Sequence, residues 1–275
     1  MTSRRWYHSL SLAYSLTILS HSPGRFKEVF RLRTLIRLTL IWLMLLSLPV
    51  SSKAEAVLEI GKFSAETEGH EIPLDWKVQT FKAIPSATTY SLVKDADTVV
   101  LRAESRSSYA ALVKKVRIDP REYPIIKWRW KTTGIYDKGD ATRKDGDDYS
   151  ARLYIIFEYQ PEELSIWERL QYQAARLLYG EYPPTAAINY IWGNRAAIGS
   201  MIPNAYSNRS MMFVLESGPK RLNMWIEEQR NVYEDFRQAF QREPPDITAV
   251  AIVNDSDNTG ESSISYFGDI ELRKN

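Results

Sequence analysis

The sequence predicts a mostly β protein, an antiparallel jelly-roll β-sandwich with one or two short helices. Short runs rich in β-branched and aromatic residues recur along the chain, and clusters of Gly, Pro, Asp and Asn separate them. These runs do not alternate regularly with helical segments, which argues against a parallel α/β sheet. The chain has no cysteine, but about 220 residues can bury a stabilising core without disulfides.

The predicted strands are separated by turn signals. They cover residues 89–95, 98–105, 109–118, 125–132, 151–159, 187–193, 211–217, 223–231, 246–255 and 264–272. Two helices interrupt them. Apolar residues at three- and four-residue spacing predict the first over Pro161–Tyr179, which Gly180 ends. The second is predicted over Val232–Phe240. No linker divides the chain after the leader, so we expect one domain over residues 55–275.

Residues 1–54 have the pattern of a secretory leader. A basic stretch precedes the apolar core Leu38–Val50, and small residues follow, with Ala54 and Ala56 as candidate cleavage positions. A membrane-spanning helix needs about 20 apolar residues, so this core is short for a permanent anchor. The prediction is a periplasmic or secreted protein with no stable membrane span after cleavage. An uncleaved anchor is the alternative.

The charge balance changes when the leader is removed. Of 36 basic and 34 acidic residues, eight and one lie in residues 1–54, which leaves 28 against 33 and a net charge of −5. The folded part therefore has no basic excess for nucleic acid. Outside the leader His70 is the sole histidine, which excludes a multi-histidine zinc site. A serine-protease triad would have to use His70, which has no nucleophile motif nearby.

The remaining chemistry belongs to carboxylates, amides, guanidinium groups and tryptophans. Strand period two places Asp148 and Arg152 on one face, Arg129 opposite its neighbouring tryptophans, and Glu228 with Arg230. If such faces meet on one concave sheet, they line a polar groove with aromatic neighbours. The predicted ligand-binding residues are Trp128, Arg129, Trp130, Asp148, Arg152, Trp192, Glu228 and Arg230. The alternative is that the charges pair across a solvated sheet and the tryptophans are core.

The stretch "NDSDNTGE", residues 254–261, is crowded with oxygen-bearing side chains. Its start matches part of a helix–loop–helix calcium loop, but position twelve is Tyr266 instead of Glu and both flanks predict strands. That kind of site is therefore rejected. A structural calcium of another kind is possible, with Asp255, Asp257 and Asp269 as candidate ligands. A tight polar turn is the alternative, and direct ligand contact is a third.

Several long motifs carry a resemblance to a known family. The stretches "YPIIKWRWK", "DGDDYSARLYIIF", "NYIWGN", "EEQRNVYEDFRQAF" and "VAIVNDSDNTGESSISYFGDIEL" resemble an uncharacterised family of Gram-negative envelope proteins, domain of unknown function 3047. The resemblance covers roughly Ile60 to Leu272 and implies export and a β-sandwich, but no reaction. Its motif residues map onto Trp128, Trp130, Asp147, Asp148, Arg152, Trp192, Arg230, Asp235, Asp255, Asp257, Asn258 and Asp269.

A looser likeness concerns the two ends of the domain. An opening segment with Phe63 and Trp76 and a closing "YFGDIEL" are similar to the ends of galactose-binding-like and carbohydrate-binding jelly rolls. In such folds the first and last strands lie together, and a structural calcium often sits nearby. This is analogy at the level of the fold, which supports fold more than function.

These observations leave three functions open. The leading hypothesis is non-catalytic binding of a glycan or a similar polar ligand in the cell envelope. The second is a carbohydrate-active enzyme, a hydrolase or lyase, in which Asp148 and Glu228 supply the paired carboxylates. The third is a structural envelope protein that binds protein partners through one sheet face. A paired carboxylate of raised pKa would favour the enzyme, and a shallow groove with an aromatic edge would favour binding.

Overall fold

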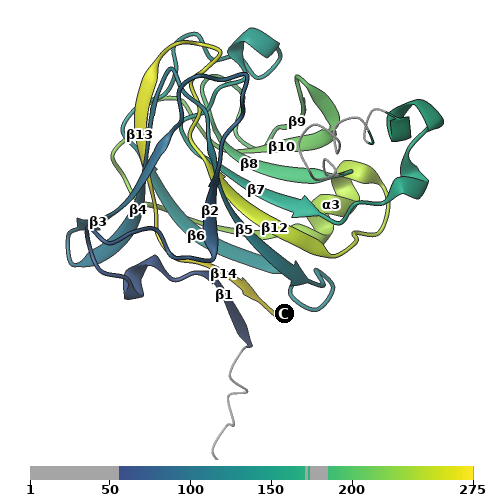
Figure 1. The fold of residues 1–275 in the computed structure, drawn as a ribbon, viewed down its shortest axis with the longest axis horizontal. Helices are drawn as coiled ribbons and strands as arrows, with labels where there is room; N and C mark the ends of the chain where they lie inside the picture. Colours follow the sequence, from purple (N-terminus) through teal and green to yellow (C-terminus); the bar gives the residue numbers. More distant parts are fainter. Residues whose placement is uncertain (1–55, 171–172, 174–184, 275) are drawn as a thin grey trace, which may run out of the picture. The chain divides into compact units, whose positions relative to one another are not determined.

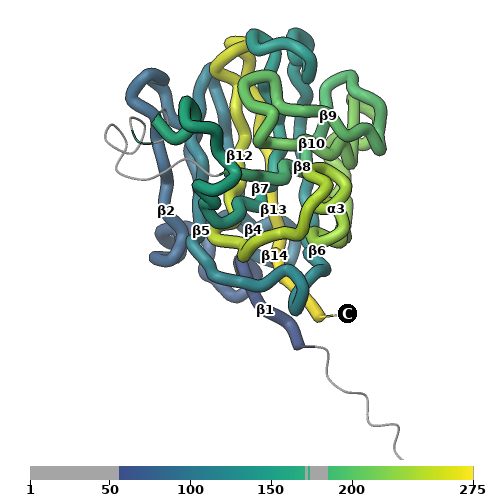
Figure 2. Tube along the Cα trace, turned by 90° about the vertical axis from the view of Figure 1, so that its right-hand side faces the viewer, coloured from purple at the N-terminus to yellow at the C-terminus, as the bar shows by residue number. Residues whose placement is uncertain are grey.

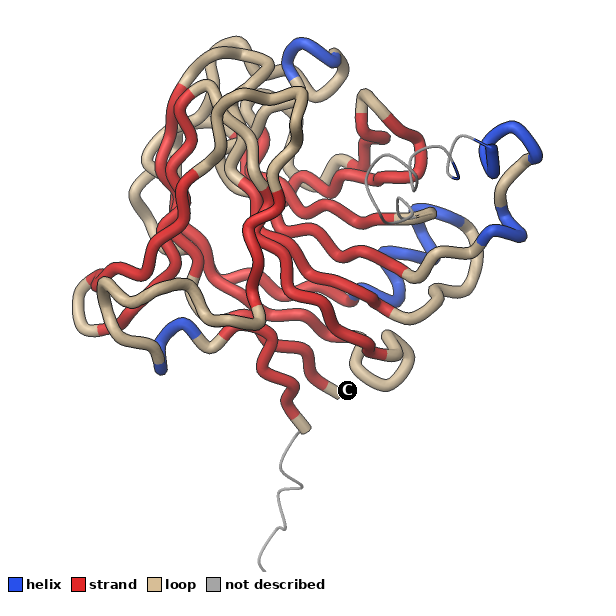
Figure 3. Tube along the Cα trace, in the orientation of Figure 1, coloured by secondary structure: helices blue, strands red, loops and turns tan. Residues whose placement is uncertain are grey.

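The computed structural model describes residues 56–170, 173 and 185–274 and shows two β-sheets that form a sandwich (Figures 1 and 3). The predicted mostly β class is confirmed. Residues 55–275 cluster as one compact unit. The predicted secretory leader, residues 1–54, lies outside the described residues; of the two candidate cleavage positions, Ala56 is described and Ala54 is not. Among the described residues, no helix is long and apolar enough to cross a membrane.

The first sheet, sheet A, has β6 at its centre. Its hydrogen-bonded order is β1–β14–β6–β13–β4–β3, and β11 pairs with the other edge of β6. The strands are β1 (Val57–Gly61), β3 (Thr89–Asp95), β4 (Thr98–Arg106), β6 (Ile125–Thr132), β11 (Ile226–Asn231), β13 (Ser262–Phe267) and β14 (Ile270–Arg273). The first and last strands, β1 and β14, pair with each other, as the jelly-roll likeness predicts.

The second sheet, sheet B, runs in the order β2–β5–β12–β7–β8–β10–β9. Its strands are β2 (Trp76–Gln79), β5 (Ala111–Ile118), β7 (Arg152–Phe157), β8 (Ala187–Gly193), β9 (Met201–Asn204), β10 (Ser207–Ser217) and β12 (Ile247–Val253). Its pairs are antiparallel except β8 with β10. This parallel pair departs from the predicted antiparallel sandwich. It arises because β9 and β10 form a hairpin whose second strand returns between β9 and β8.

The closing segment differs from the single strand predicted over residues 264–272. It is broken at Gly268 and Asp269 into β13 and β14, which lie end to end along the same edge of β6. The break faces Arg129, whose carbonyl accepts a hydrogen bond from the Gly268 N–H at 2.9 Å. A Cβ atom at Gly268 would lie 2.5 Å from Cγ of Arg129. Glycine therefore lets the Arg129 side chain cross this gap.

The core between the sheets is built around aromatic side chains of β6 and β8. Trp128 stacks on Tyr190 with ring centroids 5.2 Å apart, and Trp130 lies 6.2 Å from Trp192. All four rings are buried. Burial of such large side chains dominates core energetics, so these contacts join the two sheets. The pattern "KWRWK" therefore places Trp128 and Trp130 inward and the three cations on the outer face of sheet A.

Both predicted helical segments are present within the described part of the chain, which also has two short 3₁₀ turns, η1 (Phe63–Ala65) and η2 (Lys144–Gly146). Helix α3 spans Val232–Phe240, the predicted bounds, and packs against β6, β8 and β11 (Figure 2). Asn231 begins it, because its side chain accepts a hydrogen bond from the Glu234 N–H at 3.0 Å. The other segment starts with a 3₁₀ turn, η3 (Pro161–Glu163), and residues 166–170 and 173 are helical. The rest of the helix predicted to Tyr179 lies outside the described residues.

Candidate functional site

The structure places the predicted site residues in three separate environments instead of one groove. The first is a buried network of aspartates around Arg152, the second is the inner edge of β11, and the third is a pocket on the outer face of sheet A. The expectation that Asp148 and Arg152 share a groove with Arg129 is wrong. Arg152 lies on β7 of sheet B and is 2% exposed, whereas Arg129 lies on β6 of sheet A and is half-buried.

Arg152 is the centre of the buried network. Its guanidinium group forms ion pairs with Asp147 at 3.0 Å and with Asp255 at 3.1 Å, and these three side chains are almost completely buried. It also lies over the ring of Tyr149, 4.1 Å from the ring centroid. Such a group is neutralised inside the protein and has no opening to a ligand. The prediction that Arg152 contacts a ligand therefore does not fit its place in the structure.

Asp148 holds the loop of residues 254–261. It is fully buried, and its carboxylate accepts bonds from the Thr259 N–H at 2.6 Å and from Nδ2 of Asn258 at 3.0 Å. Asn254, also buried, accepts a hydrogen bond at Oδ1 from the Tyr136 hydroxyl at 2.6 Å. The loop is thus a tight polar turn tied to the rest of the fold. Asp148 cannot act as the second carboxylate of a Glu228 pair, because both its oxygens are occupied in the interior.

The candidate calcium ligands are only partly brought together. Oxygens of Asp148, Asp255 and Asp257 lie within 4.8 Å of one another, whereas Asp269 is bound elsewhere, to Ser64 and Lys62. Among the described residues, Oδ1 of Asp257 is buried without a hydrogen-bond partner. Burial and the neighbouring Asp148 raise the pKa of Asp257. These neighbouring carboxylate oxygens, one of them without a hydrogen-bond partner, suit a hard cation such as Ca²⁺. The third candidate ligand is thus Asp148 and not the predicted Asp269.

The second environment lies on the inner side of β11. Glu228 faces the same side as Trp128, and its carboxylate accepts a bond from Nε1 of Trp130 at 3.2 Å. Burial, and then the negative charge of Glu216, raise the pKa of Glu228 to about 7. Burial also raises the pKa of Glu216, which is ion-paired with Arg221. This pair of perturbed carboxyl groups is the feature that sequence reasoning missed, since Glu216 lies on another strand.

Arg230, next on the same face of β11, has a structural partner. Its guanidinium group pairs with Asp235 of α3, and Nε donates at 2.9 Å. The hydroxyl of Tyr190 donates to the same carboxylate at 2.7 Å. These contacts tie β11, α3 and β8 together. Arg230 is half-buried, and its contact with Asp235 holds α3 against the two sheets.

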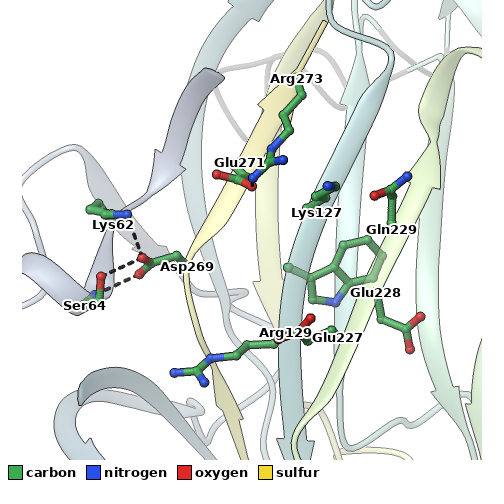
Figure 4. Close-up of a pocket in the computed structure, with 11 residues that line it drawn as sticks. Lys62, Ser64, Lys127, Arg129, Glu227, Glu228, Gln229, Asp269, Glu271 and Arg273 are labelled. Atoms are coloured by element: carbon green, nitrogen blue, oxygen red, sulfur yellow. Dashed lines mark hydrogen bonds and ion pairs between the residues drawn. The ribbon is translucent and has the colours of Figure 1, made fainter. Parts of the chain in front are cut away.

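The third environment is a pocket of about 590 Å³ on the outer face of sheet A (Figure 4). Trp128, Arg129, Glu228 and Asp269 from the predicted set line it, together with residues that were not predicted to belong to a site. The full lining is Lys62, Ser64, Lys127, Trp128, Arg129, Glu227, Glu228, Gln229, Asp269, Glu271 and Arg273. The pocket forms where β14 replaces β13 beside β6, opposite β11.

The predicted aromatic platforms are wrong, because Trp128, Trp130 and Trp192 are at most 3% exposed. Trp225 is the half-buried tryptophan beside the pocket. The guanidinium group of Arg129 lies over its ring at 4.5 Å from the centroid. The signal was present in the sequence, since period two places Trp225 on the face of Glu227 and Gln229. Both of these are exposed in the structure.

The fold and the site define a β-sandwich protein with a polar pocket on one sheet. The family model described as "Protein of unknown function (DUF3047)" matches residues 74–271, and the chain belongs to this family. The chain matches none of the curated proteins compared with it. Among solved structures it is similar to endoglucanase 3 from family GH12 of Trichoderma harzianum, with 8% identity and a TM-score of 0.37. That likeness covers 74% of this chain and 100% of the other.

Proposed function

We propose that the protein binds a glycan or a similar polyhydroxylated ligand in the cell envelope, without chemistry, at the pocket on the outer face of sheet A. The observation that carries this proposal is the pocket of about 590 Å³ and its mixed lining of amide, carboxylate and cationic side chains. Such groups bind hydroxyls from several directions at once, and ligand sites commonly combine a few polar groups with an aromatic or apolar surface.

Three side chains supply the contacts in this proposal. Gln229 and Glu227 project from β11 and are exposed, so that their oxygens and amide are available to hydroxyl groups. Trp225 supplies a flat apolar surface for a sugar ring on the part of its half-buried ring that Arg129 and Lys131, 4.5 and 5.0 Å from the ring centroid, leave exposed. Arg129 joins the two regions, because it lines the pocket and contacts the Trp225 ring.

A glycan-array screen followed by calorimetry tests the proposal. We expect Gln229→Ala and Trp225→Ala each to weaken binding by roughly fivefold to tenfold, because each loses about 1 kcal/mol of hydrogen bonding or stacking. Lys77→Gln is the control, since Lys77 is exposed on β2 of the other sheet. The proposal fails if no glycan binds, or if the control weakens binding as much as the pocket variants do.

A carbohydrate hydrolase is the second candidate, and Glu228 is the specific observation that favours it. A carboxyl group with a pKa of about 7 is protonated to a useful degree near neutral pH and can act as a general acid. Glu216 is the nearby carboxyl group that perturbs it. In this reading Glu228 protonates the leaving-group oxygen of a glycosidic bond.

Release of reducing sugar from a glycan that the protein binds tests the second candidate. If Glu228 is the acid, Glu228→Gln should lower the rate at least about 100-fold, and the rate should fall as the pH rises through about 7. Binding should persist in the variant, because Gln keeps the shape of Glu. A bound glycan that is never cleaved at any pH between about 4 and 9 rules the hydrolase out.

A further inference from the structure

The charged groups around the pocket on the outer face of sheet A are unevenly paired. Four basic side chains line the pocket, Lys62, Lys127, Arg129 and Arg273, against three acidic ones on that face, Glu227, Asp269 and Glu271. Glu228 also lines the pocket, although its carboxylate lies on the opposite face of β11, toward Trp130. Glu59, opposite Glu271 in the strand register, is a further acid on this face and pairs with Lys62 at 3.3 Å. Cations and anions are therefore equal in number, and the pairing decides which cations are available.

Two of the three acids that line the pocket on this face are already engaged. Asp269 accepts hydrogen bonds from the Ser64 backbone N–H at 2.8 Å and from the Ser64 hydroxyl at 2.6 Å, and it pairs with Lys62 at 3.1 Å (Figure 4). Glu271 pairs with Arg273, although the strand register places Glu271 opposite Lys127. Neither carboxylate is therefore free to pair with the cations of the central strand, β6.

Lys127 and Arg129 remain, because the third cation of β6, Lys131, pairs with Asp95 at 2.8 Å. Among the described residues, no carboxylate lies within ion-pairing distance of either group. Arg129 instead contacts the Trp225 ring. Glu227 lies opposite Arg129 in the strand register, and it is exposed and forms no ion pair within the described part of the chain. Asp95, which forms no ion pair with Arg129, still feels its charge, because Lys131 and, to a lesser degree, Arg129 lower the pKa of Asp95. An anionic ligand would thus find two cations that have no ion-pair partner beside one acid that has none either.

The positions of the two cations restrict the kind of anion. They are two residues apart on one strand face, a separation of about 7 Å along the strand. Figure 4 shows Lys127 projecting beside Gln229, whereas Arg129 extends toward the break between β13 and β14, below Asp269. The two groups therefore do not converge on one point, as they would around a single phosphate. They suit a ligand that carries separated carboxylates and also offers hydroxyls to Gln229 and Glu227.

We infer that the pocket selects acidic glycans, that is, oligosaccharides of hexuronic acid whose successive carboxylates meet Lys127 and Arg129. This inference rests on the proposed glycan-binding function and adds the substrate class. Arg129 also keeps its contact with Trp225, so that a carboxylate and the face of a sugar ring are recognised side by side. Since the cations are partly exposed, the attraction should weaken with salt over the range in which the screening length falls below about 10 Å.

Calorimetry with the purified protein tests the inference by comparing a hexuronate oligosaccharide with the same oligosaccharide after its carboxyl groups are reduced to alcohols. We expect the acidic form to bind about tenfold or more tightly than the neutral form. Lys127→Gln and Arg129→Gln should each lower the ratio of the affinity for the acidic form to that for the neutral form by about tenfold, since one charge-assisted contact is worth about that much. Lys77→Gln should affect neither.

The other outcomes separate the acidic-glycan inference from the proposed glycan-binding function. Equal affinity for both forms, with Lys127→Gln and Arg129→Gln without effect, overturns the acidic-glycan inference but leaves the proposed function standing. Binding of neither form overturns the proposed function and the inference together. Inorganic phosphate at millimolar concentration is the competitor. If it displaces the oligosaccharide completely, the site recognises a compact anion and the inference is wrong; failure to displace it supports the separated-carboxylate arrangement.

Discussion

The environment of Glu228 raises the pKa of its carboxyl group. Its carboxyl group is half-buried, accepts a bond from Trp130 and feels the negative charge of Glu216. The folded protein therefore holds a proton on Glu228 more tightly than the unfolded chain does, because the pKa rises from the ordinary 4.5 to about 7. Ionisation of this group works against folding, and the cost appears as the pH rises between these two values.

Glu228→Gln should consequently stabilise the protein at neutral and alkaline pH. The variant removes a titration that opposes folding and keeps an acceptor for Trp130. We expect the variant's gain in free energy of unfolding over the parent to grow with pH from about 4.5 and to level off above about 7, at roughly 2–3 kcal/mol, which is below the full linkage value for this rise in pKa because Glu228 is partly exposed to solvent. Urea unfolding at several pH values measures it. A difference that does not change with pH would contradict the raised pKa.

Arg152 shows why a single residue can be misread. A guanidinium group four positions from an aspartate in an alternating pattern fits a ligand groove and a buried ion pair equally well. The structure resolves the ambiguity through burial, since Arg152 is 2% exposed and Asp147 and Asp255 neutralise it. Burial depends on what covers the strand end, and that cover comes from a loop about 100 residues further along the chain.

At the scale of elements, the loop of residues 254–261 is both a turn and a place for a cation. Asp148 closes the turn, and Asp255 lies in the network of Arg152. Burial raises the pKa of Asp255 well above its ordinary value, against the opposing charge of Arg152. Four aspartates surround one guanidinium group here, if Asp257 is included. A divalent cation would reduce this excess of negative charge.

Calcium should therefore raise the melting temperature of the protein. Binding to the folded state alone stabilises it by about 2.7 kcal/mol when the free ion is at 100 times its Kd. Asp257→Asn should abolish the response, because this side chain has the unpartnered oxygen. Asp269→Asn is the matched control and should leave the calcium response intact. Melting curves in chelator and in millimolar Ca²⁺ measure it, and an unchanged melting temperature in the parent protein means that the cluster is only structural.

The break between β13 and β14 is the other element that matters for function. At the break the Gly268 N–H stays hydrogen-bonded to the Arg129 carbonyl at 2.9 Å, and the Arg129 side chain crosses over the glycine into the pocket region. Any larger residue at position 268 would collide with Arg129, since a Cβ there comes within 2.5 Å of its side chain. A strand irregularity thus orients a candidate binding residue.

At the scale of the whole molecule, the two sheets are joined by the stacked rings of β6 and β8. Trp128, on Tyr190, is the central contact. Trp128→Ala should lower the free energy of unfolding by about 3–5 kcal/mol, because it leaves a cavity between the sheets. Trp225→Ala should cost less than about 1.5 kcal/mol, because its ring is half-buried on the outer face.

Urea unfolding of the two tryptophan variants measures this difference, with binding assayed in parallel. The midpoint should shift strongly for Trp128→Ala with an unchanged slope, whereas Trp225→Ala should change binding more than stability. The opposite pattern, with a stable Trp128→Ala variant that no longer binds ligand, would return Trp128 to its predicted role as a platform and remove Trp225 from the site.

Local patterns were sufficient for much of this protein. Period-two alternation and turn residues predicted the mostly β class and most strands, and apolar spacing with its end signals predicted α3 at its observed bounds. Composition limited the chemistry to oxygen-bearing, amide and cationic side chains, because cysteine is absent and histidine nearly so. All of these are properties of neighbouring residues, which the sequence displays directly.

The grouping of residues depended on strand order and burial, which no local pattern contains. Period two correctly separated the cations of "KWRWK" from its tryptophans, but it could not say which face was the core. Only packing against β8 buried Trp128 and Trp130, and only the β13–β14 break placed Asp269 near Arg129 on one face. Side-chain alternation is set within one strand, whereas a site is set by the strands that become its neighbours.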